Sequence, residues 1–194
     1  MDLPPATLPV ADPIIPDAVQ LFVSAAGAAL VEQRKESAGW KEINDAEQQM
    51  ALLPQIEMPL RNFFTPIPQV PGMFLYTREI TMPAGTLLPS RIHLFEHPFV
   101  ITKGLVSVWD DVQGWQHLRA PYLAVTTPAT RRVLYIHEET TWITSHHTTH
   151  TDPDRAVDEL TYPHLELGHM NNLTAEQLTA IESNAKPAHR AELK

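Results

Sequence analysis

The sequence predicts a mainly β protein that folds as an antiparallel sandwich or barrel. Between residues 73 and 147, short runs of β-branched and aromatic residues alternate with turn-like clusters such as PAG and DDVQG. No helical periodicity interrupts them, and about six to eight strands within roughly 75 residues are typical of an all-β domain. Hydrophobic residues make up 43% of the chain, which is enough to build a core.

The N-terminal third is predicted to form an arm, two helices and an extended segment, in that order. Residues 1–16 are rich in proline and indicate an extended arm. Residues 17–36 have helical periodicity, and a second short helix is predicted between Asn44 and Pro54. Prolines recur from residue 54 to 72, which predicts extended chain that packs on the β region.

The remaining chain supplies the predicted strands and a C-terminal extension. The strands are expected at residues 73–82, 97–104, 105–111, 122–127, 131–137 and 140–147. A capping box at Thr174 predicts a short last helix over residues 174–185. One domain with extensions follows: an arm (1–16), a helical and extended region (17–71), a β-barrel (72–150) and a C-terminal extension (151–194).

Charge and composition exclude several classes of partner. The net charge of −9 argues against nucleic acid, because the chain has no basic patch to neutralise phosphates. No apolar run is long enough for a membrane span, and the proline-rich N-terminus does not resemble a secretory signal. The chain has no cysteine, so a metal would have to be bound by His, Asp or Glu, and a cytoplasmic location is expected.

The segment GTLLPSRIHLFEHPFVITKG (85–104) contains the best candidates for chemistry. A strand is predicted over residues 90–102, which would place Arg91, His93 and His97 on one face. Residues four apart on a straight strand are separated by about 13 Å. The strand must therefore bend or bulge if the two histidines are to share an ion.

The spacing of this segment resembles the first motif of the cupin superfamily. That motif reads Gly, five residues, His-x-His, three or four residues, Glu, six residues, Gly. Here the same intervals join Gly85, Arg91, His93, His97 and Gly104, with Arg91 in place of the first His and His97 in place of the Glu. The resemblance implies a jelly-roll barrel whose motif residues gather around a divalent ion.

The second cupin motif is less complete. Residues 128–130 occupy its Pro-x-Gly turn, and counting onward places Val133 at the His position and His137 at the Asn position. The third ligand is therefore expected from either His137 or His146. The resemblance covers roughly residues 72–150 and implies a cupin-type jelly-roll barrel with N-terminal helices, an extended proline-rich arm and a short C-terminal helix.

The segments at 92–97, 137–140 and 142–146 are also similar to small cupin-like proteins encoded by tailed bacteriophages. This likeness makes four residues the candidate metal ligands: His93, Glu96, His97 and His146.

Each candidate residue also has an interpretation without a metal. The histidines are also compatible with a polar inner face that binds no ion. Arg91 would repel a divalent ion but would suit an anionic ligand. Tyr135 and His137 share a strand face and are further candidates for ligand binding. Imidazole ligands are compatible with iron, manganese, nickel or zinc.

Two hypotheses of function follow. The first is a metal-binding, phage-encoded cupin-like protein that binds or processes a small, anionic ligand inside the barrel, in the host cytoplasm. The alternative is a structural component of a phage particle, with the barrel as scaffold, residues 1–16 as tether and other phage proteins as partners. A homo-oligomer, at least a dimer, is expected in either case.

Overall fold

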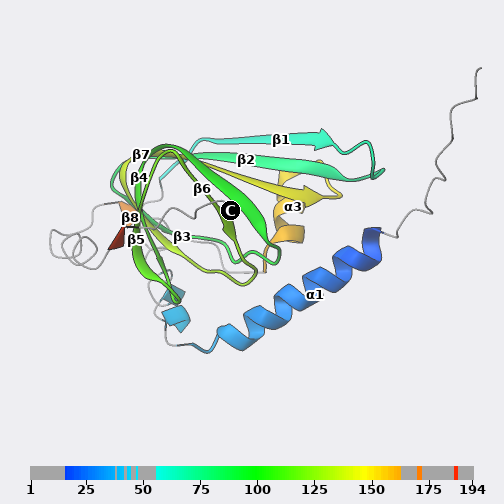
Figure 1. The fold of residues 1–194 in the computed structure, drawn as a ribbon, viewed down its shortest axis with the longest axis horizontal. Coiled ribbons are helices and arrows are strands. Elements are labelled where there is room, and N and C mark those ends of the chain that lie inside the picture. Colours follow the sequence, from blue (N-terminus) through cyan, green and yellow to red (C-terminus); the bar gives the residue numbers. More distant parts are fainter. Residues whose placement is uncertain are drawn as a thin grey trace, which may run out of the picture.

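Two long antiparallel strands, β4 (His97–Asp110) and β7 (Val133–Thr148), form the centre of the fold in the computed structural model (Figure 1). The structure describes residues 16–37, 39–41, 43, 44, 47, 56–162, 170–171 and 186–187. The predicted arm, except Pro16, and the predicted helix at 174–185 lie outside the described residues, as does most of the segment between Asn44 and Pro54.

The two long strands bend and contribute to two sheets. The first half of β4 and the second half of β7 join β1 (Leu60–Pro66), β2 (Phe74–Met82) and β6 (Tyr122–Thr126) in the order β1-β2-β7-β4-β6. Their other halves join β3 (Thr86–Pro89) and β5 (Gly114–Arg119) in the order β3-β7-β4-β5. Two short strands extend the edges: β8 (Met170–Asn171) beside β3 and β9 (Lys186–Pro187) beside β5. The predicted mainly β, antiparallel jelly roll is confirmed, although the sheet does not close fully.

A β-bulge at Gly104 decides which side chains of β4 face inward. The register with β7 shifts between Ile101 and Val106, and Gly104 has a φ of +96°. Before the bulge the odd-numbered residues are buried, as Ile101 is, whereas after it the even-numbered Val106 and Val108 are buried. The bulge also explains why the predicted strands at 97–104 and 105–111 are one continuous element.

The main core lies between the two sheets. Phe99 and Trp142 stack with ring centroids 4.4 Å apart, and Ile101, Val106 and Ile136 are fully buried beside them. Each such side chain stabilises the fold by about 1.5–3 kcal/mol relative to exposure. At the end of the sandwich, α3 (Pro153–Leu160) contributes Ala156 and Leu160 to a smaller hydrophobic cluster with Tyr76.

Two helices pack at this end. Helix α1 (Pro16–Arg34) confirms the helix predicted at 17–36, and its Val31 packs with Ile92 and Leu94. At Gly27 of α1, an added Cβ would lie 2.2 Å from the Leu94 carbonyl oxygen, so the helix and the 90–96 segment are in close backbone contact. Helix α3 was not predicted, although Asp152 caps it and Pro153 opens it, which is a common helix-start pattern.

The predicted strand at residues 90–102 is wrong over its first half. Strand β4 begins only at His97, and residues 90–96 are irregular apart from one bridge between His93 and Thr161. Burial of Ile92 and Leu94 against α1 draws this segment away from a straight path. The bend that the histidine spacing requires is therefore present.

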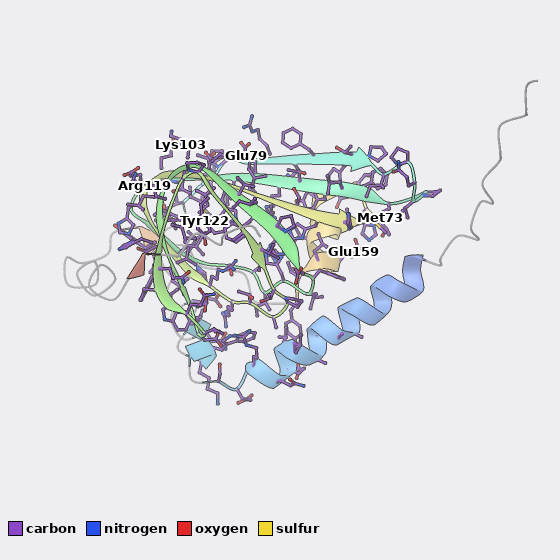
Figure 2. All side chains as sticks on the ribbon, viewed as in Figure 1. Met73, Glu79, Lys103, Arg119, Tyr122 and Glu159 are labelled. Carbon is purple, nitrogen blue, oxygen red and sulfur yellow. The ribbon has the colours of Figure 1, made fainter. Side chains whose placement is uncertain are left out.

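Charged side chains lie mainly on the surface (Figure 2). Near the bend of the sheets, Lys103 pairs with Glu139 at 2.6 Å and Arg119 with Glu138 at 3.1 Å. Such exposed pairs contribute little to stability. Within the described residues, no helix combines the length and apolar character of a membrane span.

Candidate metal centre

Three histidines converge inside the sandwich, and we call them the inner cluster. His93 comes from the segment after β3, His97 is the first residue of β4, and His146 lies near the end of β7. One ligand nitrogen of each lies within 4.8 Å of the others. The ring centroids are 4.2 Å apart for His93–His97 and His97–His146, and 5.2 Å for His93–His146.

The backbone around His93 is fixed by hydrogen bonds to its neighbours. The Leu94 N–H donates to the Leu160 carbonyl at 3.0 Å, and the Tyr162 N–H donates to Ile92 at 2.9 Å. The Ala129 N–H donates to the His93 carbonyl at 2.9 Å. The end of α3 and the loop at residue 129 thus hold His93 toward the interior.

The other two histidines are placed by strand alternation. On β7 the buried residues of the second half are even-numbered, as His146 is, and His146 lies opposite Tyr76 of β2. His97 is 3% exposed and lies opposite Thr126 of β6. Its Nδ1 lies 3.2 Å from the Phe95 carbonyl oxygen, which can only accept. The proton is therefore on Nδ1, and Nε2 keeps a free lone pair.

Burial keeps all three imidazoles neutral at pH 7. Burial lowers the pKa of His97 to about 4 and, together with the nearby His97, that of His146 to about 3. The pKa of His93 is held well below 6.5 by burial and by the two other histidines. Neutral imidazole is the form that binds a metal.

One nitrogen of the inner cluster lacks a partner. The Nδ1 of His93 is buried, and no described residue hydrogen-bonds to it. A buried nitrogen left in this way costs about 1–3 kcal/mol, and a metal ion would remove that cost. Ligand nitrogens around a tetrahedral zinc ion are roughly 3.3 Å apart, so small side-chain rotations would complete the site. The donor set fits a transition metal.

Two predicted site residues lie at the edge of this arrangement. Glu96 is exposed and does not belong to the group of three, so the described metal-ligand group contains no carboxylate. Arg91 is exposed but lines the cavity that reaches the histidines.

Tyr135 and His137 lie on the opposite face of the sheet from the inner cluster. Together with Ser107 and His117 they form a second group, which we call the outer cluster. The Ser107 Oγ lies 2.9 Å from His117 Nδ1 and 2.7 Å from His137 Nε2. The Tyr135 ring meets the His137 ring edge-on at 4.8 Å. The structure thus brings His146, and not His137, to His93 and His97, because even-numbered residues of β7 face inward.

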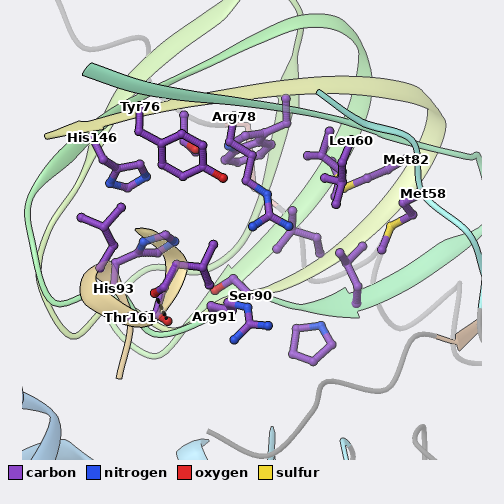
Figure 3. Close-up of a pocket in the computed structure, with 18 of the residues that line it drawn as sticks. Met58, Leu60, Tyr76, Arg78, Met82, Ser90, Arg91, His93, His146 and Thr161 are labelled. Atoms are coloured by element: carbon purple, nitrogen blue, oxygen red, sulfur yellow. Dashed lines mark hydrogen bonds between the residues drawn. The ribbon is translucent and has the colours of Figure 1, made fainter. Parts of the chain in front are cut away.

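A cavity of about 470 Å³ extends from the inner cluster between β2 and β3 (Figure 3). His93 and His146 line one end, and apolar side chains of β1, β2 and β7 line the other. Arg78 of β2 reaches into it between these ends, which the sequence analysis did not identify. Alternation along FLYTREITM (74–82) would have placed Arg78 on the same face as Tyr76 and Met82.

A second arginine, Arg132, lies behind the histidines. Arg132 donates to the Thr126 hydroxyl at 2.7 Å, and its guanidinium lies 5.2 Å from the centre of the Phe99 ring. Its charge and that of Arg78 help to lower the pKa of His93. The described surroundings of the inner cluster are therefore positively charged.

No protein-family model matches the chain, and no curated protein matches it significantly. Solved structures that are similar include an ectoine synthase from P. lautus, at 11% identity and a TM-score of 0.39 over 68% of this chain and 88% of that one. A cupin superfamily protein from Desulfitobacterium hafniense is similar at 6% identity and a TM-score of 0.38, covering 48% and 79%. A salicylate 1,2-dioxygenase from Pseudoaminobacter salicylatoxidans is similar at 14% identity and a TM-score of 0.36, over 55% of this chain and 31% of that one. Identities and TM-scores this low say nothing about function.

Proposed function

We propose that the protein binds a divalent transition metal through His93, His97 and His146, and that it binds or processes a small anionic ligand there. Iron, manganese, nickel and zinc are all compatible with three imidazoles. The notion that it is phage-encoded is part of the same proposal and rests on the sequence resemblance alone.

The observation that carries the proposal is the convergence of three neutral imidazoles, two buried and one half-buried, whose ligand nitrogens lie within 4.8 Å of one another. They come from three separate parts of the chain, and the His93 Nδ1 has no described hydrogen-bond partner. A polar interior without metal would leave that desolvation cost in place. Metal ligation through the His93 Nδ1 would remove it.

Charge supports an anionic ligand. Three neutral ligands leave the two positive charges of the ion uncompensated, and the described ligand group adds no carboxylate. Arg78 and Arg132 add positive charge nearby. An anion that binds next to the ion would be stabilised by all of these charges. Three protein ligands also leave a coordination position for it, where a bound ion would supply Lewis-acid chemistry.

Metal analysis of the purified protein tests the proposal. The wild type is expected to contain close to one transition metal per chain, and the His93→Ala/His97→Ala double variant close to none. His147→Ala is the matched control, because His147 is the exposed neighbour of His146 on the same strand. Circular dichroism of each variant establishes that the fold is retained. A folded wild type that binds none of the four metals when they are supplied would contradict the proposal.

The alternative, a structural component of a phage particle, depends on residues 1–16, of which only Pro16 is described. It stays a prediction. Deletion of residues 1–15 that abolishes self-assembly or partner binding, in a protein that binds no metal, would favour it.

A further inference from the structure

We infer that the cavity beside the inner cluster takes an amphipathic carboxylate, with its anionic group at Arg78 and its apolar body in the cavity end formed by β1 and β2. This inference rests on the proposed function, since it names the ligand class of the same site.

Arg78 is the residue that carries the inference. It lies on the inward face of β2, directly opposite Thr144 and two pairs along from the Tyr76–His146 pair. It is half-buried, and Figure 3 shows its guanidinium reaching into the cavity. Among the described residues it forms no salt bridge, whereas Arg61 on the neighbouring strand pairs with Glu79 outside the cavity.

The cavity offers this arginine no counter-ion. Its described lining contains two arginines, Arg78 and Arg91, and neither Asp nor Glu. A half-buried guanidinium is stabilised by an anion that meets its planar fork, and a carboxylate has the matching geometry. The positive charge of the cavity near the histidines therefore favours an anionic group there.

The rest of the cavity is apolar. On the far side of Arg78 from His146, Figure 3 shows Met58, Leu60 and Met82. The apolar lining of the cavity also includes Ile80, Leu88 and Trp142. A volume of about 470 Å³ is within the range of small-molecule sites and exceeds what a carboxylate group alone would fill. Apolar walls stabilise a hydrocarbon body and disfavour a second charge at its far end, so a monocarboxylate fits better than a dicarboxylate.

Calorimetric titration with three probes tests the ligand class. Octanoate has both parts, acetate has only the anionic group, and 1-octanol has essentially only the apolar body. Metal-loaded wild type is expected to bind octanoate at least about tenfold more tightly than either of the others. Octyl phosphate is the fourth probe, and tighter binding of it than of octanoate would overturn the carboxylate assignment.

Two arginine variants test the position of the anionic group. Arg78→Gln is expected to weaken octanoate binding by about ten- to hundredfold, with 1-octanol binding and metal content unchanged. Arg78→Lys, which keeps the charge, is expected to recover part of the loss. Arg61→Gln is the matched control and should bind like wild type. Equal octanoate affinity in Arg78→Gln and Arg61→Gln would refute the role of Arg78.

Metal content measured on the same samples separates the two proposals. Metal binding without octanoate binding overturns the ligand class and leaves the metal centre supported. Octanoate binding that depends on Arg78 in a protein that takes up no metal overturns the metal centre and supports the carboxylate cavity.

Discussion

The molecule contains two clusters of histidines, one on each face of the same pair of strands, and they differ in what their nitrogens contact. In the outer cluster, the Ser107 hydroxyl lies between His117 and His137 and can hydrogen-bond to both. In the inner cluster, His93 has a buried Nδ1 without a described partner. The inner imidazoles also face one another across distances that an ion could bridge.

The comparison teaches that a concentration of histidines is not by itself a metal site. The outer cluster has the composition of a site, but its described hydrogen bonds use the imidazole nitrogens for structure. The inner cluster keeps nitrogen lone pairs in a buried, positively charged setting. The more informative criterion is therefore whether the imidazole nitrogens already have partners.

The largest expected effect is on the pH dependence of stability in chelator-treated protein. The pKa of His97 is about 4 and that of His146 about 3, both below the usual 6.5. As pH falls below 6.5 the unfolded chain takes up protons before the folded chain does, so the free energy of unfolding falls. Between pH 7 and pH 4 we expect a loss on the order of 6 kcal/mol, about 3 kcal/mol from each histidine, because one pKa unit corresponds to about 1.36 kcal/mol.

Urea unfolding at a series of pH values measures this loss. In His97→Leu/His146→Leu the loss should be much smaller, and the difference between the two proteins isolates the inner cluster from the carboxylates. Identical pH profiles would mean that these histidines are not kept neutral by the fold.

The next effect is expected at the bulge that separates the clusters. Gly104 has a φ of +96°, and an added Cβ would lie 2.5 Å from the Glu139 carbonyl oxygen. Gly104→Ala should therefore destabilise the protein by about 3 kcal/mol, from backbone strain and steric overlap. It should also weaken metal binding, because the bulge sets which residues of β4 face inward.

Gly114→Ala is the control for this variant. Gly114 also has a positive φ, of +69°, but nothing lies within 4 Å of an added Cβ. We expect a loss of about 1–2 kcal/mol and unchanged metal content. If the two variants behave alike, the bulge is not the device that separates the clusters.

How far the sequence alone predicts the site depends on which signals are local. Motif spacing singled out His93 and His97, and the likeness to phage-encoded cupin-like proteins added Glu96 and His146. The choice between His137 and His146 could not be made, because a break was predicted between strands at 131–137 and 140–147. On the one continuous strand β7, alternation puts these two residues on opposite faces. Likewise, the irregular path of residues 90–96, where a strand was predicted, depends on packing of Ile92 and Leu94 against α1. That is a long-range contact with no local signal.

Other features could have been found. Asp152 followed by Pro153 is a recognisable helix start, and Arg78 shares a strand face with Tyr76, Ile80 and Met82. The antiparallel jelly roll itself was predictable, since many short β-rich runs without helices between them allow few other folds.

A smaller effect is expected where α1 supports the inner cluster. Gly27→Ala places a Cβ 2.2 Å from the Leu94 carbonyl oxygen and must push α1 away from the segment that carries His93. We expect a net loss of about 2 kcal/mol despite the higher helix propensity of alanine, and a severalfold weaker metal affinity.

Ala29→Gly, at an exposed position of the same helix, is the control. It should cost about 1 kcal/mol through helix propensity alone and leave metal affinity unchanged. Equal metal affinity in Gly27→Ala and wild type would show that the inner cluster does not depend on the helix.

The smallest effect is expected in the outer cluster. Ser107→Ala removes the hydroxyl that lies 2.9 Å from His117 Nδ1 and 2.7 Å from His137 Nε2. The loss of two hydrogen bonds at a fully buried position should lower the free energy of unfolding by about 1–2 kcal/mol. Metal content should not change, because these nitrogens serve structure. Ser145→Ala, which removes one longer contact to Thr77 at 3.2 Å, provides the comparison and should cost less. A fall in metal content in Ser107→Ala alone would mean that the outer cluster contributes to metal binding, and the distinction between the two clusters would no longer hold.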